Sequence, residues 1–366
     1  MDWQTLLDRL HDKGLTVTAR SMHKIPYTTE KGVFDDLSES NISWWTNGFW
    51  AGLLWQFYGA YGGEILRKAA EEVEEKLDKV FLLPQGMDHD SGFRWLPTAG
   101  ANYTLTGSED SRRRLQLAAN DLAGRFNPAG NFIRAWNDSG DGKTAGWAII
   151  DCMMNLPLLY RASELLNDPR FRLIAVRHAS TAGKAFVRAD GSVCHIVAFD
   201  PNTGERLCSL GRQGFGHGSS WTRGQAWALY GFTLSYLHTG ERDYLLTAVK
   251  VADRFLQRIP GSGLIPVDFD QPAATAYEDS TAAAIAACGL IELAEAARDP
   301  GYREATLRLL TALAEKRLNL DEDCDHLLEK CTAAYHDARH EFAIIYGDYY
   351  FTEAVMKLCG KETFLW

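Results

Sequence analysis

The chain has 366 residues, of which 46% are hydrophobic, so it is long enough and apolar enough to bury a large core. Its formal net charge of -10 disfavours nucleic acid as a partner, because phosphate binding requires a cationic surface. No stretch has the composition of an interdomain linker, and we therefore expect a single domain over residues 1–366.

Helices make up most of the predicted structure. Five turns containing Gly, Asn or Asp each open an amphipathic stretch, and they lie at 62–67, 107–112, 167–172, 240–244 and 299–303. Most follow a stretch that is apolar on all sides, namely 48–61, 148–166, 221–238 and 281–297. A helix that is apolar all round is enclosed by other helices, whereas one with a polar face borders water. About six such pairs predict an all-α fold, the (α/α)6 barrel, with an outer ring of helices around an inner ring.

Strand signals are weak. They are limited to residues 191–198 and 264–269, either of which is consistent with a short hairpin on one rim of the barrel. The longest connection, residues 190–220, is rich in glycine. Loops of that length in a compact domain are usually functional.

Aromatic motifs with an embedded polar residue recur along the chain. They lie at 44–50, 88–93, 133–136, 150–155, 221–227, 277–280 and 346–350. Because most of them open an enclosed helix or occupy the loop before it, we expect them to converge on one end of the barrel. Aromatic faces beside an arginine and a carboxamide, as in residues 221–227, suit a sugar ring that carries a carboxylate.

Two aspartates are the candidate acids. Asp90 precedes a turn in which Gly92 allows close approach of the backbone, and Asp151 lies in an apolar setting where an ionised carboxylate is costly. Taken alone, Asp151 fits either a structural hydrogen bond or catalysis. If both carboxyls face one cavity, repulsion and poor solvation raise the pKa of at least one of them. Asp279 and Asp348 are predicted to be helix N-caps.

The histidines and cysteines do not predict a metal site. His336 and His340 have the spacing of an HExxH motif, but Asp337 takes the place of the glutamate and no third ligand is evident. His195 and His217, in the glycine-rich loop, are candidates for substrate contact or for simple exposure. Seven cysteines without a CxxC pair disfavour both a zinc ribbon and a disulfide framework.

These features predict a cytoplasmic protein. Reduced thiols fit that compartment, and the first residues lack a basic region followed by an apolar stretch. No run of 18 apolar residues occurs, so we expect no membrane partner.

The ordered motifs resemble those of the unsaturated glucuronyl hydrolases of glycoside hydrolase family 88. The resemblance covers nearly the whole chain and is carried by WWTNGFWAGLLW (44–55), DHDSGF (88–93), IRAW (133–136), IIDCMMNLPLLYRAS (149–163), SSWTRGQAWALYGF (219–232), EDSTAAAIAACGL (278–290) and YGDYYFTEA (346–354). It implies the (α/α)6 barrel, and it implies an enzyme that works without a metal or an organic cofactor.

The resemblance also implies roles for individual residues. Asp151 matches the general acid/base of the family, and Asp90 matches its second essential aspartate. The substrate-binding residues that it implies are Trp45, Trp136, His195, Gln213, Trp221, Arg223 and Trp227, with Arg223 expected to face the substrate carboxylate.

The reaction that the resemblance implies is the hydration of an enol ether rather than attack at the anomeric carbon. The substrate is an oligosaccharide with a 4,5-unsaturated uronate at its non-reducing end, as polysaccharide lyases produce. Three alternatives remain open at this stage: an unsaturated rhamnogalacturonyl hydrolase, an (α/α)6 sugar epimerase that relies on histidines, and a non-catalytic uronate-binding protein.

Overall fold

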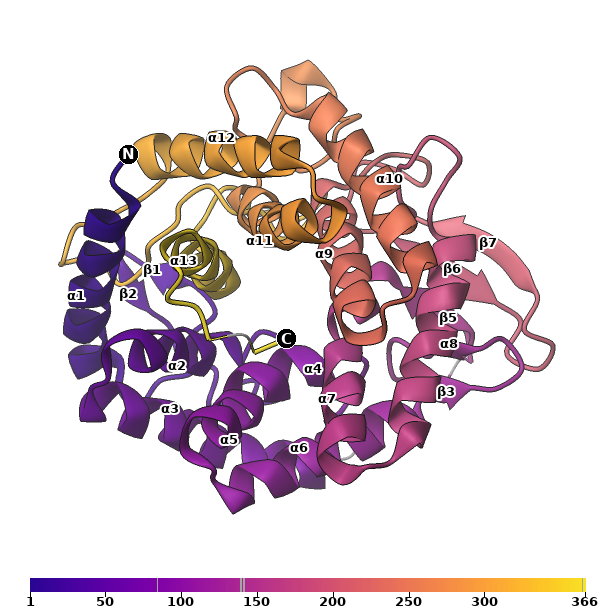
Figure 1. The fold of residues 1–366 in the computed structure, drawn as a ribbon, viewed down its shortest axis with the longest axis horizontal. Coiled ribbons are helices and arrows are strands. Elements are labelled where there is room, and N and C mark those ends of the chain that lie inside the picture. The colour runs from indigo at the N-terminus through magenta and orange to yellow at the C-terminus, as the bar shows by residue number, and fades with distance from the viewer. Residues whose placement is uncertain (84, 139, 141, 364) are drawn as a thin grey trace.

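The computed structural model describes residues 1–366 except positions 84, 139, 141 and 364. Its helices form two concentric rings (Figure 1). The inner ring consists of α2 (Phe49–Tyr61), α4 with α5 (Ser91–Trp95 and Ala101–Thr106), α7 (Leu156–Leu166), α9 (Thr222–Thr239), α11 (Ser280–Ala297) and α13 (Ile345–Cys359). The outer ring consists of α1 (Trp3–Ser21), α3 (Glu64–Leu77), α6 (Glu109–Gly124), α8 (Pro169–Ala185), α10 (Arg242–Arg258) and α12 (Pro300–Lys316). This arrangement is the predicted (α/α)6 barrel.

Burial explains which helices are inner and which are outer. In α11 every residue from Ser280 to Ile291 is buried. In α10 the buried residues are three or four apart and define a single face, namely Tyr244, Ala248, Val251, Ala252 and Phe255. By length and composition alone α11 also resembles a membrane span, but it packs against α9, α12 and α13 as a core helix of the barrel.

The five predicted turns are confirmed. Each joins an inner helix to the outer helix that follows it. Each also places a residue with a positive φ at the end of the inner helix, namely Gly62, Gly107, Asn167, Gly240 and Arg298. The sixth pair was not evident from the sequence, because it consists of α13 and α1 from opposite ends of the chain.

The second inner helix is interrupted. A π-helical turn, Leu96–Gly100, separates α4 from α5. Pro97 lies in that turn and cannot donate a backbone hydrogen bond, which accounts for the break in the α-helical pattern. Short 3-10 segments also occur at Asp78–Leu82, Ile150–Met154 and Ala273–Thr275.

The described residues also form three small antiparallel sheets in addition to the helices. They pair β1 (Thr29–Glu30) with β2 (Val33–Phe34), β3 (Phe126–Asn127) with β4 (Phe132–Ile133), and β5 (Trp147–Ile149) with β6 (Ile196–Phe199), which in turn pairs with β7 (Arg206–Leu210). The strand predicted at 191–198 is therefore found, shifted to 196–199. The strand considered at 264–269 is not, because that segment forms only isolated bridges, with Trp221 and Glu278.

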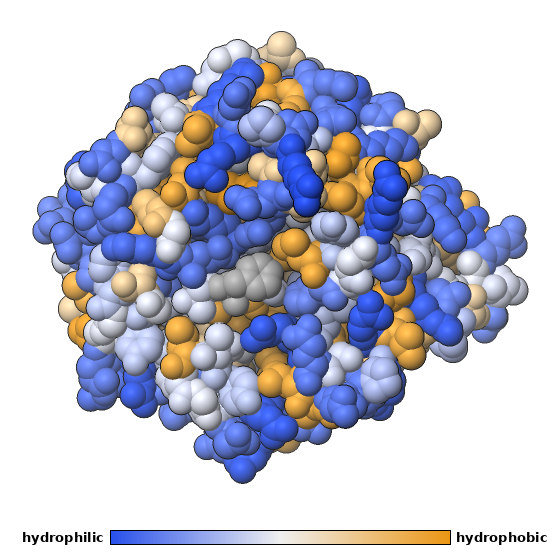
Figure 2. Space-filling model, in the orientation of Figure 1, coloured by the Kyte–Doolittle hydropathy of each residue, from blue (hydrophilic) through white to orange (hydrophobic). Residues whose placement is uncertain are grey.

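The C-terminal segment crosses the barrel at the C-terminal ends of the inner helices. Trp366 is buried, its ring stacks on Tyr350 with centroids 5.8 Å apart, and its Nε1 donates to Glu353 at 2.9 Å. The C-terminus lies inside the ring of inner helices in the view of Figure 1, and the rim of the same face is largely hydrophilic with scattered hydrophobic residues (Figure 2). The N-terminal ends of the inner helices, which carry the aromatic motifs, lie at the other end.

Candidate active site

A cavity of about 470 Å³ lies at the N-terminal ends of the inner helices. Its lining combines aromatic rings with carboxyls: Asn41, Ser43, Trp44, Trp45, Asp88, His89, Asp90, Trp136, Ile149, Asp151 and Gln213. A second cavity of about 430 Å³ shares Trp44, Trp45, Trp136 and Gln213, and adds Tyr27, Arg212, Arg223, Asp337 and Tyr346. The predicted convergence of the aromatic motifs at one end of the barrel is confirmed.

Asp151 is held by the three-stranded sheet and by the 3-10 turn that follows β5. Ile149 pairs with Ile196, and the N–H of Ile150 donates to the carbonyl of His195 at 3.1 Å. The Asp151 carboxyl is partly buried in the cavity wall, and its Oδ1 has no hydrogen-bond partner among the described residues. Burial raises the pKa of Asp151 to about 7, against the opposing charge of Arg223. A proton on this carboxyl therefore persists close to neutral pH.

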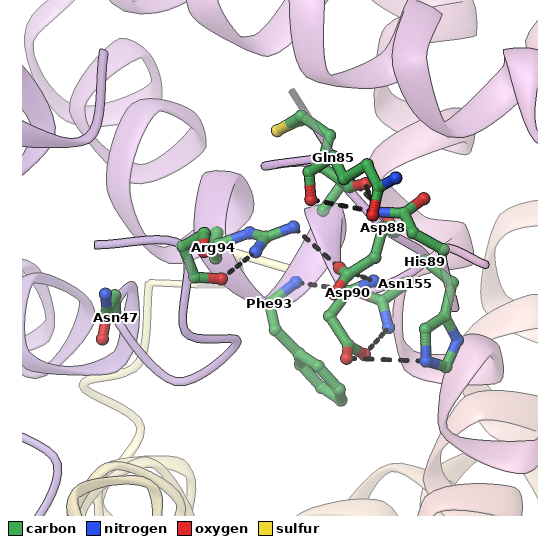
Figure 3. Close-up of polar contacts among 12 residues, drawn as sticks. Asn47, Gln85, Asp88, His89, Asp90, Phe93, Arg94 and Asn155 are labelled. Carbon is green, nitrogen blue, oxygen red and sulfur yellow. Dashed lines mark hydrogen bonds and ion pairs between the residues drawn. The ribbon is translucent and has the colours of Figure 1, made fainter. Parts of the chain in front are cut away.

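Asp90 lies directly before α4, between His89 and the first turn of that helix (Figure 3). Its backbone N–H donates to Asp88 Oδ1 at 3.0 Å, and Asp88 also accepts from the buried guanidinium of Arg94 at 2.7 Å. Burial, and next the charges of Asp88 and Asp151, raise the pKa of Asp90 well above its usual range. The two predicted acids thus face one cavity and influence each other's ionisation.

Arg223 lies in the wall of the second cavity but is only 1% exposed. Its Nη1 donates to Asp279 at 2.6 Å and to the carbonyl of Thr332 at 2.7 Å, and its Nη2 donates to the carbonyl of Ala333. Asp279 also caps α11, as predicted, by accepting from the N–H of Thr281. The expected contact between Arg223 and a substrate carboxylate stays a prediction, because the terminal nitrogens of this guanidinium already bind protein oxygens.

His195 and Gln213 lie together on the same side of the site. The Nδ1 of His195 accepts from the backbone N–H groups of Arg212 and Gln213 at 3.2 and 3.3 Å, so the proton of the neutral ring is assigned to Nε2. Burial, and next the charge of Arg223, lower the pKa of His195 to about 3. His195 is therefore a neutral donor, while the Gln213 side chain reaches the carbonyl of Ala333 at 3.2 Å.

The four predicted tryptophans divide into two groups. Trp45 and Trp136 are partly exposed and line both cavities. Trp221 is only 3% exposed and packs against His195 with centroids 4.4 Å apart. Trp227 is fully buried against Phe93 and Tyr350, because it lies further along α9 than the rim. Trp227 packs beneath the cavity, and its expected ring contact with the substrate stays a prediction.

Comparison with known proteins identifies the family. The model of glycosyl hydrolase family 88 matches residues 17–366. The chain belongs to glycosyl hydrolase family 88. It is 35% identical to the unsaturated glucuronyl hydrolase of Bacillus sp. (strain GL1), over 96% of each chain, and 33% identical to the unsaturated chondroitin disaccharide hydrolase of Streptococcus pyogenes serotype M1, over 86% of this chain and 80% of that one.

A solved structure shows the same fold with a bound saccharide. It is described as a UGL variant with dGlcA-Glc-Rha-Glc, and it superposes with a TM-score of 0.89 at 32% identity, over 96% of both chains. As a family 88 member the chain is a glycoside hydrolase with an (α/α)6 barrel fold.

Several residues at the family 88 site were not predicted from the sequence. Trp44 lines both cavities, and Arg212 lies over the rings of Trp136 and Trp147 at 5.3 and 5.9 Å. Within the part of the chain that the structure describes, no carboxylate lies within ion-pair distance of the Arg212 guanidinium. Arg212 follows β7, and it reaches the rings of Trp136 and Trp147 because β5 pairs with β6 and β6 pairs with β7. The spacing of residues in the sequence does not show these strand pairings.

The remaining histidine and aspartate expectations concern structure. His336 and His340 each direct Nε2 to a backbone carbonyl, of Phe215 and Tyr335 respectively, both at 2.9 Å. Among the described residues no group of three or more His, Cys, Asp or Glu side chains has the arrangement of a metal site. Asp348 is not an N-cap: it lies inside α13 and accepts from the N–H of Leu328 at 2.7 Å.

Proposed function

We propose that this chain is an unsaturated glucuronyl hydrolase, which removes a 4,5-unsaturated uronate from the non-reducing end of a lyase-generated oligosaccharide. The observation that carries the proposal is the pair of buried carboxyls, Asp151 and Asp90, in a cavity walled by tryptophans. The relatives named for this activity and the solved structure with a dGlcA-containing saccharide support the choice of substrate.

The raised pKa of Asp151 suits the first step of the reaction. An enol ether is a weak base at carbon, so it needs a carboxylic acid that is still protonated near neutral pH. Asp151 donates its proton to C4, the C4=C5 double bond is consumed, and positive charge develops at C5 and the ring oxygen. The nearby Asp90 carboxyl orients the sugar and helps to keep Asp151 protonated.

The second step returns the proton. A water molecule forms a bond to C5 through its oxygen, and its proton passes to the Asp151 carboxylate, so the net change is the addition of one water across the double bond. The resulting hemiketal opens and then releases the rest of the saccharide. The enzyme ends with Asp151 protonated, ready for another turnover.

The cavity also supplies groups for an anionic sugar. Trp45 and Trp136 offer ring faces. The neutral His195 lies behind the cavity lining, and its buried Nε2 has no partner among the described residues. The exposed guanidinium of Arg212 stands over Trp136 and offers a positive charge to a carboxylate. This arrangement supports binding of a uronate rather than of a neutral hexose.

The alternatives are less well supported. An epimerase of this fold would need histidines that gain and lose protons, whereas burial lowers the pKa of His89 to about 4 and that of His195 to about 3. A rhamnogalacturonyl hydrolase would share the hydration chemistry, but the matched relatives are named for glucuronyl and chondroitin substrates. A binding protein would not need a buried, protonated acid in its cavity.

One experiment tests the proposal. The protein is incubated with defined unsaturated disaccharides that differ in linkage and sulfation, and the loss of the enol-ether absorbance is followed with and without a chelator. We expect wild type to consume at least one disaccharide at the same rate in both conditions. No consumption of any disaccharide refutes the proposed function, and inactivation by the chelator refutes the metal-free mechanism.

We also propose that the protein works in a reducing compartment, the cytoplasm. All seven cysteines are free thiols, and four of them are buried. Labelling of the thiols after extraction of the native source under non-reducing conditions tests this. Seven labelled thiols are expected, and a disulfide-linked pair would contradict it.

A further inference from the structure

A buried carboxamide connects the two segments that carry the aspartates. Asn155 is fully buried at the junction between the 3-10 turn of Asp151 and helix α7. Its Oδ1 accepts the backbone N–H of Phe93 at 2.8 Å, and its Nδ2 donates to Asp90 Oδ1 at 3.2 Å and to the carbonyl of Asp151 at 3.3 Å (Figure 3). A single side chain therefore contacts both acid-bearing segments.

The fit between these segments is tight. A Cβ placed on Gly92 would stand 2.6 Å from the Cα of Asn155, so the turn after Asp90 and the turn after Asp151 touch through their backbones. Close packing of this kind leaves Asn155 little freedom to rotate away from Asp90. The direction of its hydrogen bonds is fixed as well, because Oδ1 must face the Phe93 N–H.

The orientation of the Asn155 carboxamide gives the two carboxyls different hydrogen-bond partners. Asp90 receives a donated N–H on Oδ1, which favours its ionised form. The corresponding atom of Asp151, Oδ1, is enclosed and has no hydrogen-bond partner among the described residues. Burial raises the pKa of both carboxyls, and the hydrogen bond from Asn155 opposes that rise at the Asp90 carboxyl.

We propose that Asn155 is a positioning residue that fixes the two aspartates relative to each other and, through its donated hydrogen bond, favours the ionised form of Asp90 against the burial of that carboxyl, which leaves the proton of the pair on Asp151. The inference rests on the proposed function and deepens it, because it states which acid of the pair is ready to protonate the double bond. Asn155 contacts two cavity-lining residues but does not itself line the cavity.

Other charges act on the same pair. The charged and titratable side chains around Asp90 are Asp88, His89 and Arg94 of its own segment, Asp151 and Cys152 of the facing turn, and Arg125 beyond them. Asp88 is engaged by Arg94, and His89 Nε2 lies 3.5 Å from Asp90 Oδ2. Asn155, at 3.2 Å, is a closer neutral donor to the Asp90 carboxyl than the His89 ring.

The substitution Asn155→Asp removes the donor and places a second carboxyl beside Asp90. It keeps the size of the side chain and an oxygen for the Phe93 N–H, but it replaces the NH2 that faces Asp90 with a carboxylate oxygen. We expect the acidic limb of the kcat/KM profile to move up by about one pH unit, so that activity on that side falls about tenfold, with kcat affected more than KM.

The chain offers a matched control. Asn102 is a buried asparagine on α5 whose Nδ2 donates to Glu74 at 2.9 Å, and its Oδ1 accepts from Thr106, far from the cavity. Asn102→Asp should lower the melting temperature comparably and leave both limbs of the pH profile in place. An Asn155→Asp profile that falls uniformly at every pH, as with a merely structural residue, overturns the inference.

A second measurement needs neither turnover nor a stable Asn155 variant. The carboxylic-acid C=O stretch is recorded by infrared difference spectroscopy at about pH 6 for wild type and Asp151→Asn. Other buried acids, such as Asp348, cancel in the difference between the two proteins. The wild-type minus Asp151→Asn spectrum should therefore contain one carboxylic-acid band, and its absence overturns the inference. Because this readout does not use a substrate, it separates a failure of the Asn155 inference from a failure of the proposed function.

Discussion

Replacing Asp151 with asparagine should stabilise the protein at high pH while removing its activity. The pKa of this carboxyl is 3.8 in a model compound and about 7 in the folded chain. Because the folded-state pKa is raised, the folded protein holds a proton that the unfolded chain releases above about pH 4. Stability is therefore fully present below that pH, is lost as the pH rises to about 7, and stays lost above it.

The size of the effect follows from linkage. Each pH unit between the two pKa values costs about 1.4 kcal/mol, and integrating for a single carboxyl gives a loss of about 2.5 kcal/mol between pH 5 and pH 8. The asparagine side chain cannot ionise, so the variant should avoid this loss. The free energy of unfolding of Asp151→Asn relative to wild type should rise by about 2.5 kcal/mol over that interval.

The assay is urea denaturation of both proteins at the two pH values. The control is Glu304→Gln, which removes an exposed carboxyl of α12 and should show no such pH-dependent difference from wild type. A gap between Asp151→Asn and wild type that is equal at the two pH values, or that shrinks at high pH, would show that Asp151 is not a buried acid.

Three further predictions follow from the same geometry. The kcat/KM of wild type should fall about tenfold per pH unit above about pH 7, because Asp151 ionises there. The absorbance assay is run in buffers of different pH, and a kcat/KM that stays constant up to pH 9 would contradict the role of Asp151 as the acid. Asp279→Asn leaves the buried Arg223 without its carboxylate and should cost about 3–5 kcal/mol in urea denaturation, and a cost below about 1 kcal/mol would contradict the ion pair. Trp227→Ala should lower the free energy of unfolding by about 3–5 kcal/mol because the ring is fully buried, whereas Trp136→Ala should mainly raise KM. The reverse pattern would contradict the packing role of Trp227 and the place of Trp136 in the cavity lining.

The sequence predicts the ring of helices well because its signals are local. Each inner helix ends at a residue with a positive φ, and the polar first turn of the next helix follows within a few residues. The pairing of α1 with α13 has no such local signal, since the two helices come from opposite ends of the chain. The break at Pro97 and the pairing of β5 with β6 likewise depend on tertiary contacts.

The site was predicted in composition more than in geometry. Asp151 was identified from its apolar surroundings and Asp90 from the turn with Gly92 that follows it, and the structure brings both to one cavity. The engagement of Arg223 by Asp279 and the burial of Trp227 could not be predicted, because helix periodicity does not say which turn reaches the cavity. Arg212 was missed because nothing in its immediate sequence resembles a binding motif.

The order of two events tests the central claim most directly. In a rapid-quench experiment with an unsaturated disaccharide, the loss of the enol-ether absorbance and the release of the second sugar are followed in the same reaction. Protonation and hydration of the double bond by Asp151 predict that absorbance loss precedes or coincides with sugar release. Release of the sugar while the absorbance persists would show cleavage at the anomeric carbon and contradict the account.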